Sequence, residues 1–124
     1  MPDRPRRPLA ETFIPLSPAV FDILLALCDD ERHGYGIMQE VERRSGGQTQ
    51  LRPGTLYRAV ARLVDEGLIE ESDERPAPDL DDERRRYYRL TELGRKVVAA
   101  EGRRLAGLLR AIRAKKALRG GELA

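Results

Sequence analysis

The hydrophobic period of the sequence changes near Gly67, and this change restricts the possible folds more than any other feature does. Before Gly67, apolar residues recur at the three- and four-residue spacing of amphipathic helices. The clearest case is the stretch "GTLYRAVARLVDEGLI", residues 54–69, whose apolar positions follow one helical face: Leu56, Val60, Leu63, Val64 and Leu68. The opposite face is polar, so this predicted helix has one side for a core and one for solvent or a partner.

The stretches after this helix have the shorter period of β-strands. Residues 68–72 ("LIEES") and 85–91 ("RRYYRLT") flank an acidic loop that contains two prolines. Two short strands separated by such a loop predict a β-hairpin. In the second strand, alternation places Tyr88 and Leu90 on the same face.

Local signals mark the ends of the other helices. Ser17 followed by Pro18 is typical of a helix start, and Thr91 is expected to cap a last helix over about residues 92–116. Gly46 and Gly47 are expected to end the second helix, and Gly67 the third. The order is three helices, a hairpin and a long helix, which predicts a chain that is mainly α with a β-hairpin. We interpret it as a winged helix-turn-helix plus a C-terminal dimerisation helix.

The chain of 124 residues divides into four predicted segments. Residues 1–16 form a flexible, basic, proline-rich arm, and residues 17–91 the winged helix-turn-helix. Residues 92–118 form the dimerisation helix, and residues 119–124 a tail. The last helix has an apolar stripe that so small a domain cannot bury, so a homodimer is expected. The residues predicted to make it are Val20, Phe21, Val98, Leu105, Leu108, Leu109 and Ile112.

The composition argues against an enzyme and against a metal protein. Cys28 is the only cysteine, which excludes an internal disulfide, and we expect a buried, inert thiol. His33 is the only histidine, and a local structural hydrogen bond is its expected role. The acidic residues 79–83 lack the glycine and terminal glutamate of a calcium loop. Neither a signal peptide nor a membrane span is evident, so we expect a soluble cytoplasmic protein without a cofactor.

Nucleic-acid binding fits the helix of residues 54–69 better than catalysis does. In a helix-turn-helix, the second helix enters the major groove with its N-terminal residues at the base edges. Small Gly54 allows a close approach to phosphate, and Arg52 supplies a cation instead of a capping oxygen. The residues expected to contact DNA from the helix itself are Thr55, Tyr57, Arg58 and Arg62. The alternative is a solvated face in which Arg62 pairs with Glu66 four residues later.

The hairpin carries a second group of cations. Arg84, Arg85, Arg86 and Arg89 crowd one strand beside Tyr87. Arginines at the base of a wing are suited to bind backbone phosphates or to enter a minor groove. The alternative is that the adjacent acids at 81–83 pair with these arginines and neutralise much of their field.

Three blocks of the sequence together resemble the PadR-like family of bacterial transcriptional regulators. They are "HGYGIMQEV", "RPGTLYRAVARLVDEGLIEE" and "RRRYYRLTELGRKV", and they span most of residues 16–100. The resemblance implies a winged-helix dimer that represses transcription at a pseudo-palindromic operator. It implies that Thr55, Leu56 and Tyr57 open the recognition helix, with Leu56 in the core and Tyr57 near the DNA backbone. It also assigns to the returning wing strand Arg86, Tyr88, Leu90 and Thr91.

The chain departs from parts of that family's pattern. Its last helix is single and short, as in the family's smaller subgroup, and it contains no tryptophan. It therefore cannot reproduce the tryptophan clamp with which some small members hold flat aromatic drugs, and no effector is identified. The leading hypothesis is a homodimeric, sequence-specific DNA-binding repressor. The alternative is a winged-helix protein-interaction module that does not read DNA.

Overall fold

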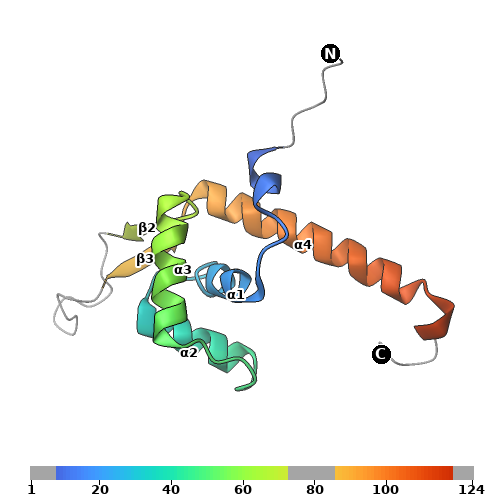
Figure 1. Ribbon diagram of the computed structural model, residues 1–124, viewed down its shortest axis with the longest axis horizontal. Helices are drawn as coiled ribbons and strands as arrows, with labels where there is room; N and C mark the ends of the chain where they lie inside the picture. The colour runs from blue at the N-terminus through green and yellow to red at the C-terminus, as the bar shows by residue number, and fades with distance from the viewer. Residues whose placement is uncertain (1–7, 73–85, 119–124) are drawn as a thin grey trace, which may run out of the picture.

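The computed structural model describes residues 8–72 and 86–118, and it contains the predicted helices and hairpin (Figure 1). The chain is mainly helical with a small antiparallel sheet, as predicted. The elements in order are η1 (Leu9–Phe13), α1 (Pro18–Ala26), β1 (Arg32–His33), α2 (Gly34–Arg44), α3 (Pro53–Asp65), β2 (Ile69–Ser72), β3 (Tyr87–Leu90), α4 (Glu92–Arg113) and η2 (Lys116–Leu118).

The helices begin and end where local chemistry predicts. The Ser17 hydroxyl accepts a hydrogen bond from the Val20 N–H at 3.3 Å, and Thr91 accepts one from the Gly94 N–H at 3.0 Å. Each bond satisfies one of the free N–H groups in a first helical turn. Gly67 follows α3 with a φ of 78°, a conformation that costs glycine little.

The sheet has one strand more than the sequence indicated. β3 lies in the centre, paired on one side with β2 and on the other with β1. The β1 pairing joins Arg32 to Tyr88 and His33 to Tyr87. A strand of two residues has no readable period, so the sequence indicates only a polar turn at this position. The pairing nevertheless fixes the start of α2 against the hairpin.

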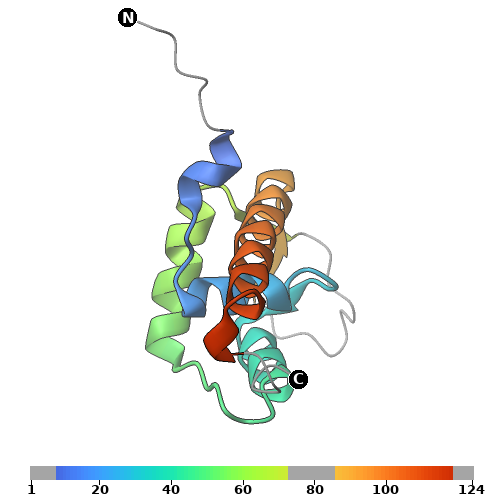
Figure 2. The same cartoon turned by 90° about the vertical axis from the view of Figure 1, so that its right-hand side faces the viewer.

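The hydrophobic core lies where the four helices meet. α1 contacts α2, α3 and α4, and it lies in the middle of the helical assembly (Figure 2). Its buried side chains Ile23 and Leu24 meet Ile37 of α2 and Leu56 of α3 within one cluster. Tyr88 and Leu90 of β3 belong to the same cluster, which confirms the face predicted for that strand. This core holds α3 with its polar face outward.

The segment before α1 differs from the flexible arm expected for residues 1–16. Residues 9–13 form η1, which packs on α4, and Phe13, Ile14 and Leu16 pack against the core. The Leu16 N–H donates to the buried carboxylate of Glu101 at 2.7 Å. Distant contacts on α4 therefore order residues whose local proline content predicts an arm. Residues 1–7 lie outside the described part of the chain.

The prediction of a buried thiol at Cys28 is wrong. α1 ends at Ala26, so Cys28 lies in the following turn and is exposed. Its Sγ donates to the Leu24 carbonyl oxygen at 3.4 Å. Partial burial, followed by the neighbouring Asp29 carboxylate, raises the pKa of this thiol. Within the described residues, no helix is both long enough and apolar enough to cross a membrane.

Candidate nucleic-acid interface

Helix α3 presents a broad polar face to solvent. Leu56, Val60 and Leu63 are buried and Ala59 packs partly against the core, whereas the other residues between them are exposed because of the helical period. The residues predicted to contact DNA from this region are all exposed: Arg52, Gly54, Thr55, Tyr57, Arg58 and Arg62. The fold therefore places the predicted helix and its flanking arginine on one accessible surface.

The first turns of α3 carry cations without acidic partners. Among the described residues, no carboxylate forms an ion pair with Arg52 or Arg58, and the Arg58 side chain lies beside Gly54. Arg52 makes no capping bond, and Pro53 is the first helical residue. The free N–H groups of the first turn and the two guanidinium groups make this end of α3 favourable for an anion.

Arg62 behaves differently from Arg58. Its Nε donates to Glu66 Oε1 at 2.7 Å, in the i, i+4 pair that the sequence offered as the alternative to DNA contact. The Arg62 side chain is nevertheless 78% exposed, so water screens this pair and leaves the guanidinium accessible. The two halves of the exposed face of α3 are therefore electrostatically unequal.

The wing arginines that the structure describes are paired with acids. Arg86 lies 3.5 Å from Glu71, and Arg89 lies 2.9 Å from Glu70 and 3.6 Å from Glu31. These acids belong to β2 and to the turn before β1, whereas the sequence suggested the loop acids at 81–83 as partners. The paired residues are far apart in the sequence, so these cross-strand pairs cannot be predicted until the strand register is known. Arg84, Arg85 and the acids at 79–83 lie outside the described residues.

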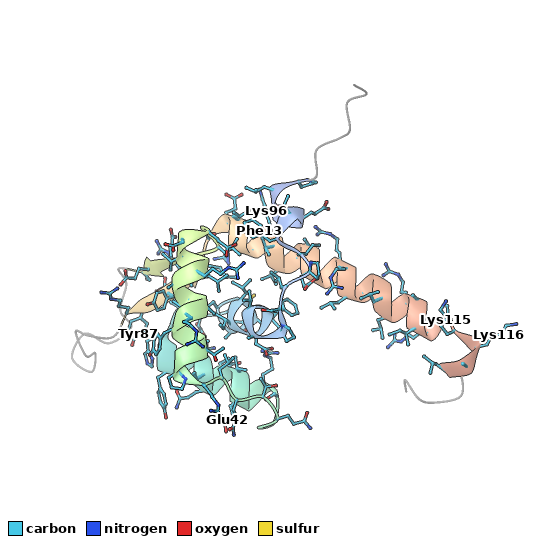
Figure 3. All side chains as sticks on the ribbon, in the orientation of Figure 1. Phe13, Glu42, Tyr87, Lys96, Lys115 and Lys116 are labelled. Carbon is cyan, nitrogen blue, oxygen red and sulfur yellow. The ribbon has the colours of Figure 1, made fainter. Side chains whose placement is uncertain are left out.

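Aromatic rings connect the start of α2 with α3 and β3. A Cβ at Gly34 would lie 2.7 Å from the Tyr57 hydroxyl oxygen, so only glycine allows this approach. The imidazole Nδ1 of His33 accepts from the Gly36 N–H at 3.0 Å, which confirms the expected local hydrogen bond. The same ring meets the edge of Tyr87, labelled in Figure 3, with centroids 5.2 Å apart.

Tyr35 is a surface residue that the sequence reasoning missed. It is exposed on the first turn of α2, and its ring stacks with His33 at a centroid distance of 6.4 Å. It shares the surface of the α2–α3 pair with Tyr57, which is also exposed. Its position in the motif "HGYG", beside two glycines, was the available signal.

The residues predicted to form the dimer divide into two groups. Val20 and Val98 pack partly against the core, and Phe21 is half-buried. The other members lie along the part of α4 that extends past the body of the protein (Figure 1). Their side chains are large, apolar and exposed: Leu105, Leu108, Leu109 and Ile112.

A small pocket lies between the segment before α1 and the second half of α3. Its volume is about 170 Å³, and its walls include Phe13, Val20 and Leu63. The paired Arg62 and Glu66 also line it. An apolar group of roughly benzene size fits such a space. Within the described residues, no group of three or more His, Cys, Asp or Glu side chains is placed to hold a metal ion.

The three-helix core, the exposed third helix and the two-stranded wing define a winged helix-turn-helix protein. The model of the transcriptional regulator PadR-like family matches residues 23–100, so the chain belongs to that family. This confirms the resemblance to that family, and the chain spans less than two thirds of the length of the two curated relatives it matches. A Lysinibacillus sphaericus protein is 35% identical over 74 residues, which are 59% of this chain and 64% of that protein. A 37.1 kDa protein in transposon TN4556 of Streptomyces fradiae is 36% identical over 86 residues, but the match covers only 22% of its length.

Solved structures share the fold. A transcriptional regulator from Clostridium thermocellum is 25% identical with a TM-score of 0.62, over 79% of this chain and 95% of that one. RosR of H. salinarum is 28% identical with a TM-score of 0.60, over 86% of each chain. Bacillus subtilis PadR, solved in complex with operator DNA, is 23% identical with a TM-score of 0.55, over 67% of this chain and 46% of that one. The chain thus spans under half of this last protein.

Proposed function

We propose that the protein is a sequence-specific DNA-binding repressor that binds a pseudo-palindromic operator as a homodimer in the cytoplasm. The N-terminal half of α3 enters the major groove, and the arginines at the root of the wing approach the phosphate backbone. Membership of a family of transcriptional regulators supports this proposal.

The observation that carries the proposal is the pair of arginines at the start of α3 with which no described carboxylate forms an ion pair. Arg58 projects from the first two turns, where a winged helix meets base edges, and Arg52 flanks the helix start. Guanidinium groups bind guanine edges and phosphates in a bidentate manner. Because no described acid pairs with either residue, no ion pair within the described part of the chain has to break before DNA binds.

The homodimer rests on the exposed end of α4. Leu108 is 50% exposed, and three further apolar side chains share its stripe. A continuous apolar stripe of this kind is an association surface in a soluble protein. A second copy packed along it would make a twofold symmetric protein, and such a protein matches a twofold symmetric operator.

Two substitutions on one helix test the proposal. Arg58→Ala is expected to lower operator affinity by about 1–3 kcal/mol and to relax the choice of base at one position in each half-site. Arg62→Ala, on the same exposed face but in an ion pair, serves as the matched control, with the smaller loss. The assay is fluorescence anisotropy with DNA selected by the purified protein from a random pool, at several salt concentrations.

The wing supports a second candidate, a protein-interaction module. Its described arginines are paired with Glu70, Glu71 and Glu31, which reduces the field available to DNA. If the pool yields no enriched sequence and Arg58→Ala leaves DNA binding unchanged, the repressor proposal is wrong. A protein partner that still binds after charge reversal at Arg58 would then favour the interaction module.

A further inference from the structure

Positive charge is concentrated on α4 and the turn after it. Residues 95–116 contain eight Lys or Arg and one Glu, a net charge of +7, so the rest of a chain whose total is +2 carries −5. Lys96 lies near one end of α4, and Lys115 and Lys116 lie beyond the other (Figure 3). The nearly neutral total therefore conceals two regions of opposite sign.

The cations occupy their own side of the helix. At 3.6 residues per turn, Arg95, Arg103, Arg110 and Arg113 fall on the side opposite Val97 and Leu108. All four arginines are exposed, and no described carboxylate forms an ion pair with any of them. We call these four arginines the basic face of α4. The segment before α1 covers a different side, where Leu16 binds Glu101.

In the proposed dimer the second protomer covers the exposed apolar stripe of α4, which leaves the basic face without the large apolar residues that a membrane surface requires. The side chains that lie between its arginines are small, namely Ala99 and Ala106, and both are exposed. A helix that lies in a bilayer interface inserts large apolar residues next to its cations. An arginine row without such residues fits a phosphate backbone, which guanidinium groups bind through paired hydrogen bonds.

We propose that the basic face of α4 binds the phosphate backbone of a second DNA duplex, without sequence preference. α1 contacts both α3 and α4, and the exposed face of α3 points away from this shared core. The apolar stripe of α4 is left to the second protomer. A dimer bound to its operator would then present two basic faces to a neighbouring duplex and hold the two duplexes together.

The proposal extends the proposed function, and a variant that cannot read the operator separates the two. Arg58→Glu protein should still bind a non-operator duplex, with an affinity that falls steeply as salt rises. Adding Arg103→Glu and Arg110→Glu should reduce this binding by about tenfold and lower the salt slope by about 0.9 for each phosphate that the variant no longer neutralises. The milder Arg103→Gln/Arg110→Gln pair guards against unfolding, which circular dichroism would detect. Arg43 is an exposed arginine on α2. Arg43→Glu changes the net charge by the same amount as Arg110→Glu, so comparing these two single variants controls for the change in net charge.

A sandwich assay tests the second duplex directly. Immobilised operator is saturated with protein, and capture of a labelled, unrelated duplex is measured at low salt. The expected result is capture by the wild type and none by Arg103→Glu/Arg110→Glu, with operator affinity unchanged within about twofold.

Equal capture by the variant overturns the proposal, as does a parallel loss of operator affinity, since the face would then contact the operator duplex itself. Binding of phosphatidylserine vesicles without capture overturns it in favour of a membrane. If only the proposed function fails, the protein will select no operator sequence, but it will still bind a non-operator duplex through the basic face of α4.

Discussion

Glu101 should be one of the most sensitive charged positions in this protein. It is 1% exposed on α4, and its carboxylate accepts from the Leu16 N–H at 2.7 Å and from Arg104 Nε at 2.5 Å. Glu101→Ala removes both acceptors and leaves the Leu16 N–H without its partner. A hydrogen bond to a charged group contributes about 1.5–3 kcal/mol to the free energy of unfolding. Removing one member of a buried ion pair lowers that free energy by about 3–5 kcal/mol.

The exposure of Arg104 places the expected effect of Glu101→Ala nearer to the loss of a hydrogen bond than to the breaking of a fully buried ion pair. The Arg104 side chain is 33% exposed, so its charge can return to water when Glu101 is removed. We therefore expect Glu101→Ala to lower the free energy of unfolding by about 2–3 kcal/mol. Glu101→Gln keeps an acceptor for Leu16 and should cost about half as much. Urea denaturation at neutral pH and fixed protein concentration measures both, because a dimer's stability depends on concentration.

Glu92 on the same helix provides the matched control. It pairs with Lys96 at 3.7 Å but is 86% exposed, so Glu92→Ala should cost less than about 1 kcal/mol. If Glu101→Ala costs no more than Glu92→Ala, the inference that Glu101 fixes the segment before α1 to α4 is wrong. Residues 9–16 that keep their full order in Glu101→Ala would contradict it as well.

Lowering the pH should remove the stabilising contribution of the Glu101 carboxylate from the wild type, whereas Glu101→Gln has no such contribution to lose. The Arg104 hydrogen bond, assisted by that of Leu16, lowers the pKa of Glu101 below its ordinary value of about 4.3. The contribution of this carboxylate is thus complete above that ordinary value and is lost as the pH falls through the lower folded pKa. The stability difference between wild type and Glu101→Gln should therefore shrink below about pH 4.

Two further predictions concern α4. A Cβ at Gly94 would lie 2.1 Å from the Leu68 carbonyl oxygen, so Gly94→Ala should lower the free energy of unfolding by at least about 3 kcal/mol. A Cβ at Gly102 would have no neighbour within 4 Å, so Gly102→Ala should leave the free energy of unfolding unchanged or raise it by up to about 1 kcal/mol. Similar unfolding curves for the two variants would contradict the close packing at Gly94. Leu108→Lys/Leu109→Lys should give a monomer at micromolar concentration in sedimentation and weaken operator binding, while Arg103→Gln, on the side of the helix opposite the apolar stripe, should do neither. A dimer that survives the double substitution would remove α4 from the interface.

Features governed by neighbouring residues could be predicted from the sequence. The caps at Ser17 and Thr91 depend on a hydroxyl three residues from the N–H that it accepts, and the helix end at Gly67 depends on a single φ angle. The core face of β3 follows from alternation alone. In each case the interaction lies within one turn or one strand, so the local pattern contains all the information.

Features that depend on distant pairs could not be predicted. The Leu16–Glu101 bond spans 85 residues, and it orders a segment whose proline content suggested an arm. The partners of Arg86 and Arg89 required the register of β2 against β3 and the unpredicted β1. In the candidate site, periodicity could place Arg58 and Arg62 on one face, but it could not show that only Arg62 has an acidic partner.

The distribution of charge separates two contributions to DNA binding. Phosphate contacts raise affinity for every sequence, whereas base contacts distinguish one sequence from another. If the proposed function holds, the acids beside Arg62, Arg86 and Arg89 reduce the positive charge available for phosphates near α3, whereas no described acid pairs with Arg58, the residue proposed to contact bases. On the proposed operator-reading surface, such an arrangement would lower affinity but preserve the ratio of specific to non-specific binding, which governs site selection in a genome. The basic face of α4, whose arginines pair with no described carboxylate, would then supply sequence-independent attraction from a surface that takes no part in reading the operator. The salt dependence of operator binding should accordingly be shallower than that of second-duplex capture.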